Sequence, residues 1–154
     1  MRAVLQRVQR AAVRVEGEIV GACGEGLMIL LGVAQGDGVE DADVLIRKIA
    51  ALRILCDEDG KMNRSLRDIH GEALVISNFT LMANYKKGNR PDYMGAAAPQ
   101  EAKALYEHFC RGLACELPHV GCGVFGAHME IEMCADGPVT IVMESEVLLG
   151  KKKE

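Results

Sequence analysis

The chain contains no run of about 18 apolar residues, the length that a helix needs to cross a bilayer. In residues 1–7, apolar side chains are interrupted by charged ones, so this segment lacks the apolar stretch of a secretory signal. There is also no internal repeat, no low-complexity stretch and no linker. These absences predict a cytoplasmic protein. Its 154 residues, 49% of them hydrophobic, predict a single domain over 1–154 with a flexible basic tail at about 150–154.

Several common catalytic and nucleotide-binding motifs are absent as well. The sequence has no G-x-S-x-G elbow, no H-E-x-x-H helix, no P-loop and no G-x-G-x-x-G turn. The acidic turn Asp57–Lys61 lacks the downstream ligands of an EF-hand, so it predicts no calcium site. The hydroxyls of Ser77 and Thr80 are potential nucleophiles, but none of the four histidines has a sequence relation to Ser77 that predicts a dyad. A mechanism driven by side chains is therefore poorly supported.

Six cysteines are present, but none of them form a C-x-x-C pair. Because the chain has no export signal, reduced and mostly packed thiols are the favoured interpretation. An alternative groups four residues as thiolate and imidazole zinc ligands, namely Cys110, Cys115, His119 and Cys122. Their spacing matches none of the usual zinc motifs, so we expect neither a metal nor a cofactor.

Charge is distributed unevenly along the chain. The net charge is −4, so the molecule as a whole does not attract nucleic acid. Positive charge is local, in Lys86–Arg90 and in the tail at Lys151–Lys153. The tail is best explained as a solvated end, whereas the central cluster closely follows the segment Ser77–Leu81. A cluster of this size predicts a few salt-sensitive phosphate contacts.

Periodicity predicts an α+β fold. Alternation or continuous apolar runs predict strands at 2–6, 13–16, 27–33, 73–76, 123–125, 129–133 and 139–145. Apolar residues at helical spacing predict one helix after a capping box of Asp37 and Glu40, and a second that Pro99 opens. We therefore expect a barrel-like double β-layer with two helices packed against it.

Two distant segments say most about function. Ser77–Leu81 follows the apolar run Ala73–Ile76, so it lies where a buried strand ends and its N–H groups become available to an oxyanion. Asp136–Thr140 places Gly-Pro ahead of another apolar run, which builds a rigid corner with outward carbonyls that suit a substrate ammonium. From the residues alone, a purely structural turn explains each segment equally well.

Together these segments resemble the paired signature of the D-aminoacyl-tRNA deacylase family. Further stretches resemble that family in the same order, at 1–8, 60–63, 88–91 and 123–129. The resemblance spans nearly the whole chain. It implies a homodimeric, metal-independent enzyme that hydrolyses the ester joining a D-amino acid, and glycine as well, to the 3′-terminal adenosine of tRNA. Its implied partners are tRNA and a second copy of the chain, with no membrane and no DNA.

The resemblance also implies roles for particular residues. Gly137 and Pro138 would form a cis peptide that enters the partner's cleft and excludes L-amino acids. The catalytic side would be lined by Ser77, Asn78, Phe79 and Thr80. The N–H groups of Phe79 and Thr80 would face the developing oxyanion, with assistance from the 2′-hydroxyl of the terminal ribose. Adenosine would be held by Phe125, Gly126, Ala127 and Met129, and tRNA phosphates by Lys86, Lys87 and Arg90.

Two positions depart from the family pattern. Asn78 stands where the family has Gln, and Ala135 where it has Asn. These departures bear on substrate preference rather than on activity. A related family that edits L-alanyl-tRNA has a different first signature, and Ser77 with Phe79 argues against it. Two other hypotheses stay open: a non-catalytic nucleic-acid-binding module using the Lys86–Arg90 patch, and a zinc-bound interaction protein.

Overall fold

The computed structural model describes residues 1–150, and the predicted tail at Lys151–Lys153 lies outside the described residues. The main sheet has six strands in the order β2-β1-β3-β6-β7, with β8 paired to β1. These strands are β1 (Arg2–Val15), β2 (Glu18–Cys23), β3 (Gly26–Gly32), β6 (Glu72–Ser77), β7 (Val120–Cys122) and β8 (Glu130–Glu144). A small separate sheet pairs β4 (Leu55–Cys56) with β5 (Met62–Arg64).

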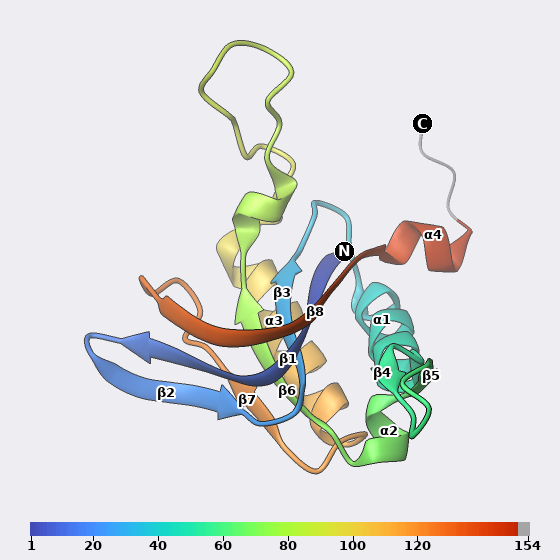
Figure 1. Ribbon diagram of the computed structural model, residues 1–154. Helices are drawn as coiled ribbons and strands as arrows, with labels where there is room; N and C mark the ends of the chain where they lie inside the picture. Colours follow the sequence, from blue (N-terminus) through green and yellow to red (C-terminus); the bar gives the residue numbers. More distant parts are fainter. Residues whose placement is uncertain (151–154) are drawn as a thin grey trace.

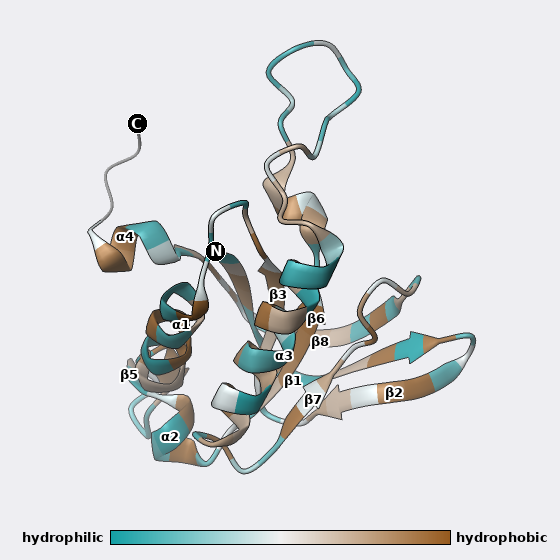
Figure 2. Ribbon diagram, turned by 180° about the vertical axis from the view of Figure 1, so that it is seen from behind, coloured by the Kyte–Doolittle hydropathy of each residue, from teal (hydrophilic) through white to brown (hydrophobic). Residues whose placement is uncertain are grey.

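Helical segments accompany this sheet. They are α1 (Val39–Ala51), α2 (Leu66–Ile69), α3 (Pro99–Ala114) and α4 (Ser145–Leu149), together with the 3₁₀ helix η1 (Phe79–Met82). Figures 1 and 2 show α3 lying across the sheet with α1 beside it. The α+β barrel-like fold is confirmed, and α1 and α3 are the two predicted helices. The short helices α2 and α4 were not predicted. Within residues 1–150 no helix is long and apolar enough to span a membrane.

Two pairs of predicted strands are in fact single long strands. The strands expected at 2–6 and 13–16 are both part of β1, which pairs with β3 in its first half, with β2 in its second half and with β8 throughout. Those expected at 129–133 and 139–145 are both part of β8. Register shifts around Val8 let both strands bend without ending, and alternation alone cannot reveal such shifts.

The two ends of the sheet approach each other at glycines. A Cβ added to Gly21 of β2 would lie 2.5 Å from the carbonyl oxygen of Cys122, and one added to Gly121 of β7 would lie 2.4 Å from that of Ala22. The His119 ring also bonds the Ala22 carbonyl, with Nε2 at 2.9 Å. Only residues without a side chain permit this backbone approach, which nearly closes the barrel.

The main hydrophobic core lies between the sheet and the helices. Both predicted helical stripes face it, with Leu45 and Ile49 of α1 and Phe109 and Leu113 of α3 fully buried. Figure 2 shows hydrophobic strands beneath α3 and hydrophilic residues on its outward side. Tyr106 is also buried on α3, although the predicted stripe did not include it. The packed core therefore holds α3 firmly against the strands that carry the site described below.

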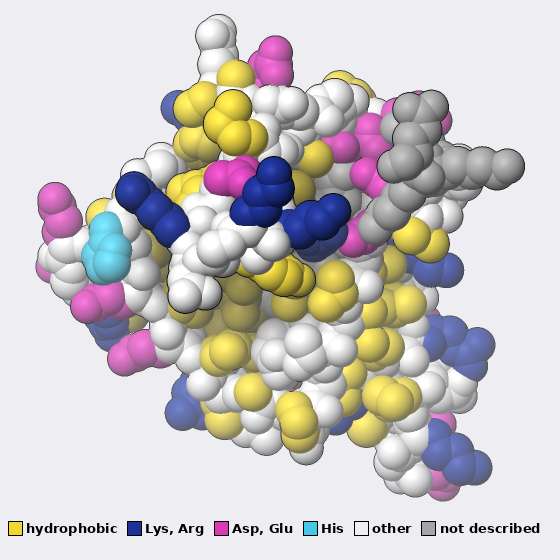
Figure 3. All heavy atoms as spheres, turned by 90° about the horizontal axis from the view of Figure 1, so that it is seen from above, with side chains coloured by type: hydrophobic (Ala, Val, Ile, Leu, Met, Phe, Trp, Pro, Cys, Tyr) yellow, Lys and Arg dark blue, Asp and Glu magenta, His cyan; other side chains and the backbone are white. Residues whose placement is uncertain are grey.

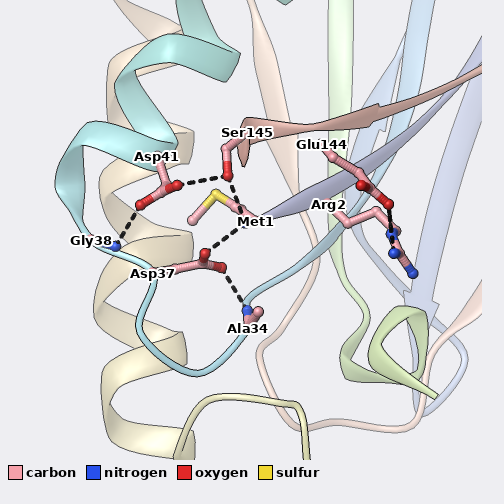
Figure 4. Close-up of polar contacts among 8 residues, drawn as sticks. All are labelled: Met1, Arg2, Ala34, Asp37, Gly38, Asp41, Glu144 and Ser145. Carbon is pink, nitrogen blue, oxygen red and sulfur yellow. Dashed lines mark hydrogen bonds and ion pairs between the residues drawn. The ribbon is translucent and has the colours of Figure 1, made fainter. Parts of the chain in front are cut away.

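A buried polar network holds the start of β1 (Figure 4). The Met1 ammonium donates to Asp37 Oδ1 and to Ser145 Oγ, each at 2.7 Å. The Ser145 hydroxyl in turn donates to Asp41 Oδ1 at 2.7 Å. Since the Met1 and Asp37 side chains are 0% and 7% exposed, this ion pair is shielded from water. The network joins β1, α1 and α4 at a single point.

This network explains why the predicted capping box is wrong. Asp37 accepts from the Met1 ammonium and from Ala34 N at 2.6 Å, so it does not cap α1. Gly38 is the N-cap residue, and its N–H donates to Asp41 Oδ2 at 3.0 Å. Asp41 therefore has the role that the sequence pattern assigned to Glu40. The buried ammonium needs a nearby carboxylate, and Asp37 provides it.

Candidate functional site

A cleft of about 430 Å³ opens where three neighbouring strands end. Strands β3, β6 and β7 are parallel, so their carboxyl ends lie at the same edge of the sheet. Crevices at this edge are common ligand sites in sheets of this kind. The start of α3 closes the cleft on one side, with Pro99 and Ala102 in its wall.

The cleft brings together two predicted sets of residues that are far apart in sequence. Ser77, Asn78 and Phe79 of the first signature line one part of it. The other part is lined by all four residues predicted to hold adenosine, namely Phe125, Gly126, Ala127 and Met129. Sequence reasoning missed the remaining lining residues, namely Leu31, Val33, Ala96, Ala97, Pro99 and Ala102. The parallel pairing of β3 with β6 was the signal that could have found Leu31, because it places both strand ends together.

Asn78 organises the turn that leaves β6. Its N–H donates to the Leu31 carbonyl at 2.8 Å, which ties the turn to β3. Its side-chain oxygen caps η1 by accepting from Thr80 N at 3.2 Å and from the Thr80 hydroxyl. The first N–H groups of a helix have no partner inside it, and no bond within residues 1–150 uses the N–H of Phe79. Phe79 N–H is therefore without a hydrogen-bond partner among residues 1–150.

The side chains of the turn provide no general base. No histidine is among the described residues that line the cleft, so the Ser77 hydroxyl has no imidazole beside it there. Thr80 is exposed and does not line the cleft. The Phe79 ring is 59% exposed and packs edge-on against Tyr93, with ring centroids 5.1 Å apart.

The wall formed by residues 123–127 is a turn and not the predicted strand. β7 ends at Cys122, and the Tyr106 hydroxyl donates to the carbonyls of Val75 and Gly123, at 2.9 and 3.3 Å. Burial raises the pKa of Tyr106, so this hydroxyl stays neutral and keeps donating. The Tyr106 and Phe125 ring centroids lie 6.0 Å apart. Tyr106 therefore positions the chain as it leaves the sheet toward Phe125.

The second signature bulges from β8. Gln6 pairs with Thr140 and Val8 with Ala135, so residues 136–139 stand opposite Arg7 alone. The Gly137–Pro138 peptide bond is cis, as the resemblance implies, and both residues are exposed. Gly137 has φ +127°, and a Cβ there would lie 2.7 Å from Val139 N, so only glycine fits. Neither residue lines the cleft of its own chain.

Buried Arg7 braces this bulge from beneath. Its Nε donates to the Asp136 carbonyl at 3.2 Å and lies 3.0 Å from Asp136 Oδ2. Its guanidinium also donates to the Ile54 carbonyl at 2.9 Å. These bonds fix the residue that immediately precedes Gly137. Sequence reasoning missed Arg7, because the register that places it opposite the bulge is not visible in the sequence.

The predicted basic residues lie on the loop after η1, which projects from the body of the protein (Figure 1). Asn84 and Asp92 exchange backbone hydrogen bonds of 2.8 and 2.9 Å at the base of this loop. The three predicted phosphate contacts beyond that base are exposed, namely Lys86, Lys87 and Arg90. Figure 3 shows Lys and Arg side chains gathered above a recess with hydrophobic walls. The loop thus presents positive charge on the face where the molecule is hollowed.

The four residues considered as zinc ligands do not form a metal site. Within residues 1–150, no three His, Cys, Asp or Glu side chains come together in a group that could hold a metal ion. His119 is instead bonded to the Ala22 carbonyl. Cys115 is exposed at the end of α3, whereas Cys110 is buried.

Arg2 links η1 to the end of β8, and we expect Arg2→Ala to loosen η1. Its guanidinium donates to Glu144 Oε1 at 2.6 Å (Figure 4) and to the Leu81 carbonyl at 2.7 Å. Since Arg2 is about a third exposed, the loss is about 1 kcal/mol, or roughly fivefold faster amide exchange in η1. Hydrogen exchange read at Leu81 and Ala83 measures it. Arg14→Ala, at the far end of β1, is the control and should leave both amides unchanged.

Comparison with known proteins shows the family of the chain. Residues 4–144 match the family model described as D-Tyr-tRNA(Tyr) deacylase. A D-aminoacyl-tRNA deacylase of Dehalococcoides mccartyi (strain CBDB1) is 54% identical over 152 residues, which cover 99% of each chain. One of Caldicellulosiruptor saccharolyticus is 53% identical over 146 residues, covering 95% of this chain and 98% of the relative.

Two solved structures share the fold of this chain. One described as "c-Myc DNA Unwinding Element Binding Protein" matches with a TM-score of 0.88 and 39% identity, over 94% of this chain and 98% of the other. A probable eukaryotic D-amino acid tRNA deacylase shares the fold, with a TM-score of 0.79 and 16% identity over 93% and 98%. The chain belongs to the D-Tyr-tRNA(Tyr) deacylase family. The family resemblance seen in the sequence is thereby confirmed.

Proposed function

We propose that this protein hydrolyses the ester bond between a D-amino acid, or glycine, and the 3′-terminal adenosine of tRNA. The observation that carries the proposal is one cleft lined both by Ser77–Phe79 and by the four residues Phe125, Gly126, Ala127 and Met129. Membership of the D-Tyr-tRNA(Tyr) deacylase family supports the same reaction. The substrate would place its adenosine in one part of the cleft and its ester carbonyl in the other.

The adenosine part is apolar and closely bounded. Phe125 offers a ring for stacking on the adenine, and Met129 and Ala127 add apolar contacts. Gly126 has φ +79° and no side chain, so the base can approach the backbone of this turn. Stacking on an aromatic ring and close backbone contact are the usual ways in which proteins hold an unpaired base.

The ester part acts through the main chain. When water attacks the ester carbonyl, negative charge develops on its oxygen, and a fixed N–H lowers the energy of that charge. Phe79 N–H is the favoured donor because it has no other partner within residues 1–150, whereas Thr80 N–H is shared with Asn78. We assign assistance in the proton transfer to the 2′-hydroxyl of the terminal ribose, since no histidine is available in the described cleft.

Selection of the D-amino acid would come from a second copy of the chain. Gly137 and Pro138 protrude from β8 and lie outside their own cleft, so they are available to the cleft of a partner. β8 pairs only with β1 within the described residues and exposes Ile131, Met133 and Val142, which suits a homodimer. A stiff backbone at this position rejects an L side chain by collision, while glycine has no side chain to collide.

A deacylation assay with matched D- and L-aminoacyl-tRNA tests the proposal. We expect release of D-tyrosine or D-aspartate, with the L-esters spared and with the same rate in the presence of a chelator. Equal cleavage of the D- and L-aminoacyl esters, or loss of activity when a chelator is added, would contradict the proposal.

A second candidate function is nucleic-acid binding without turnover. The exposed basic loop favours it, and a structural neighbour is described as binding a DNA element. This candidate predicts that the protein binds the aminoacyl-tRNA used in the deacylation assay but releases no amino acid from it. The two functions therefore give opposite results in one experiment.

The basic loop should govern affinity and not the chemical step. We expect Lys86→Ser with Lys87→Ser to raise KM for aminoacyl-tRNA about threefold to tenfold, to leave kcat unchanged and to flatten the salt dependence of binding. A matched control removes two exposed charges elsewhere, Arg47→Ser with Lys48→Ser on α1, and should change neither parameter. Steady-state kinetics at several salt concentrations decide between these outcomes. An equal rise in KM for both double variants would show that only net charge matters.

A further inference from the structure

Two thiols that the proposed reaction does not use meet beside the cleft. Cys110 is buried on α3, and Cys122 is half-buried at the end of β7. Both line a groove of about 440 Å³ together with Tyr106 and Phe125. The two thiols interact electrostatically with each other and with the Tyr106 side chain. They therefore form a pair that small molecules can reach through the groove.

The contact makes the two thiols chemically different. The hydrogen bond from Cys110 lowers the pKa of Cys122; burial opposes this effect, and interactions with Tyr106 and His119 add to it. The same contact, followed by burial, raises the pKa of Cys110. Cys122 is thus the more readily ionised of the two thiols, and it is also the more accessible. A thiolate next to a neutral thiol is the arrangement found in cysteine pairs that react with oxidants.

We propose that Cys110 and Cys122 are a redox modification site, which a hydroperoxide converts into an intrachain disulfide that locks α3 to β7. The Cys122 thiolate attacks one peroxide oxygen, the O–O bond breaks, and the departing oxygen takes up a proton. Cys122 is then a sulfenic acid. The sulfur of Cys110 attacks the sulfur of Cys122, the S–S bond forms, and hydroxide leaves with the Cys110 proton as water. Two thiols and one hydroperoxide give one disulfide, one water and one alcohol, or a second water from hydrogen peroxide.

The disulfide would act on the cleft through Tyr106. An S–S bond is about 2.05 Å long, which is shorter than any hydrogen-bond contact, so Cys122 must move toward α3. Gly123 follows directly, and its N–H donates to the Val75 carbonyl at 3.0 Å while its own carbonyl accepts from Tyr106. Phe125 is two residues further on, against the Tyr106 ring. Oxidation therefore displaces the wall that we assign to adenosine, and this second part rests on the proposed function.

Mass spectrometry of the full chain tests the modification independently of activity. Hydrogen peroxide at a stoichiometric dose should lower the intact mass by two hydrogens, about 2 Da, and dithiothreitol should restore it. Non-reducing peptide mapping of the wild type should join Cys110 to Cys122. In Cys110→Ser the reaction should stop at a dimedone-reactive sulfenic acid on Cys122. Cys115→Ser, which removes an exposed thiol at the end of the same helix, should behave as the wild type.

Other patterns would overturn the proposal. The proposal is wrong if the disulfide includes Cys115, if Cys122 is oxidised without a cross-link, or if the mass does not change. The peptide map of the wild type gives this answer even if a variant fails to fold. For the second part, we expect the oxidised protein to bind adenosine 5′-monophosphate at least threefold more weakly than the reduced protein. Equal affinities of both forms would refute that part. A reduced protein that binds no nucleotide would count against the proposed function, while the mass data would still decide on the disulfide.

Discussion

Replacing Phe79 by proline is expected to lower kcat for D-aminoacyl-tRNA by about 10²–10³-fold, because proline has no N–H to donate to the oxyanion. Phe79 is the first residue of η1, a position that tolerates proline. Asn78 before it has φ −146° and ψ 91°, an extended conformation that is compatible with a following proline. The substitution therefore removes the proposed donor and disturbs little else in the backbone. Single-turnover deacylation measures the effect on the chemical step.

Two variants separate the main chain from the side chains. Phe79→Ala keeps the N–H and removes only the ring that contacts Tyr93, so kcat should stay within about tenfold of the wild type. Thr80→Ala removes a hydroxyl that bonds the Asn78 side chain, and appreciable activity should remain. If Thr80→Ala instead lost about four orders of magnitude, Thr80 would be a nucleophile. If Phe79→Pro and Phe79→Ala were equally active, the assignment of the donor would be wrong.

Asp37→Ala is expected to lower the free energy of unfolding by about 3–5 kcal/mol. The substitution removes the carboxylate that pairs with the buried Met1 ammonium at 2.7 Å, while the bond from the ammonium to the Ser145 hydroxyl remains. The Ala34 N–H that Asp37 also satisfies loses its acceptor. For a domain of this size the expected fall in Tm is roughly 10 °C. Urea and thermal unfolding, followed by circular dichroism, measure both quantities.

A carboxylate elsewhere on the same helix is the matched control. Asp43 on α1 lies 2.7 Å from His108 Nε2, a distance equal to that of the Met1–Asp37 pair. Both side chains of that pair are more than a third exposed, Asp43 at 41% and His108 at 35%. Exposed pairs contribute at most about 1 kcal/mol, so Asp43→Ala should have a small effect. If Asp37→Ala and Asp43→Ala lowered the free energy of unfolding equally, burial of the Met1 ammonium would not add to the stability of its ion pair.

The parts of the fold that sequence predicted are those set by local pattern. The stripe containing Leu45 and Ile49 was enough to place α1, and Pro99 was enough to start α3. The first signature was located correctly because an apolar run ends at Ile76 and polar residues follow. At each of these positions the neighbours along the chain carry the information.

The parts that sequence missed depend on contacts between distant residues. Ser145 bonds Met1 across 144 positions, and this contact turns Asp37 from a helix cap into the partner of an ammonium. The bulge at Gly137 exists because four residues of β8 face Arg7 alone, which depends on strand register. The free N–H of Phe79 follows from capping by Asn78, a side-chain choice that the apolar pattern does not report. Such features require the folded structure.

The pairing of β1 with β8 also bears on when the protein folds. Translation produces β1 first and β8 near the end, yet these two strands are hydrogen-bonded along nearly their whole length. Folds that rely on pairings so distant in sequence form slowly, because a long chain segment must be closed before any bond is gained. While the ribosome is still synthesising the chain, β1 has only β2 and β3 to pair with. The Arg7 side chain meets the segment that it braces only after most of the polypeptide has emerged, so the enzyme matures after synthesis is nearly complete.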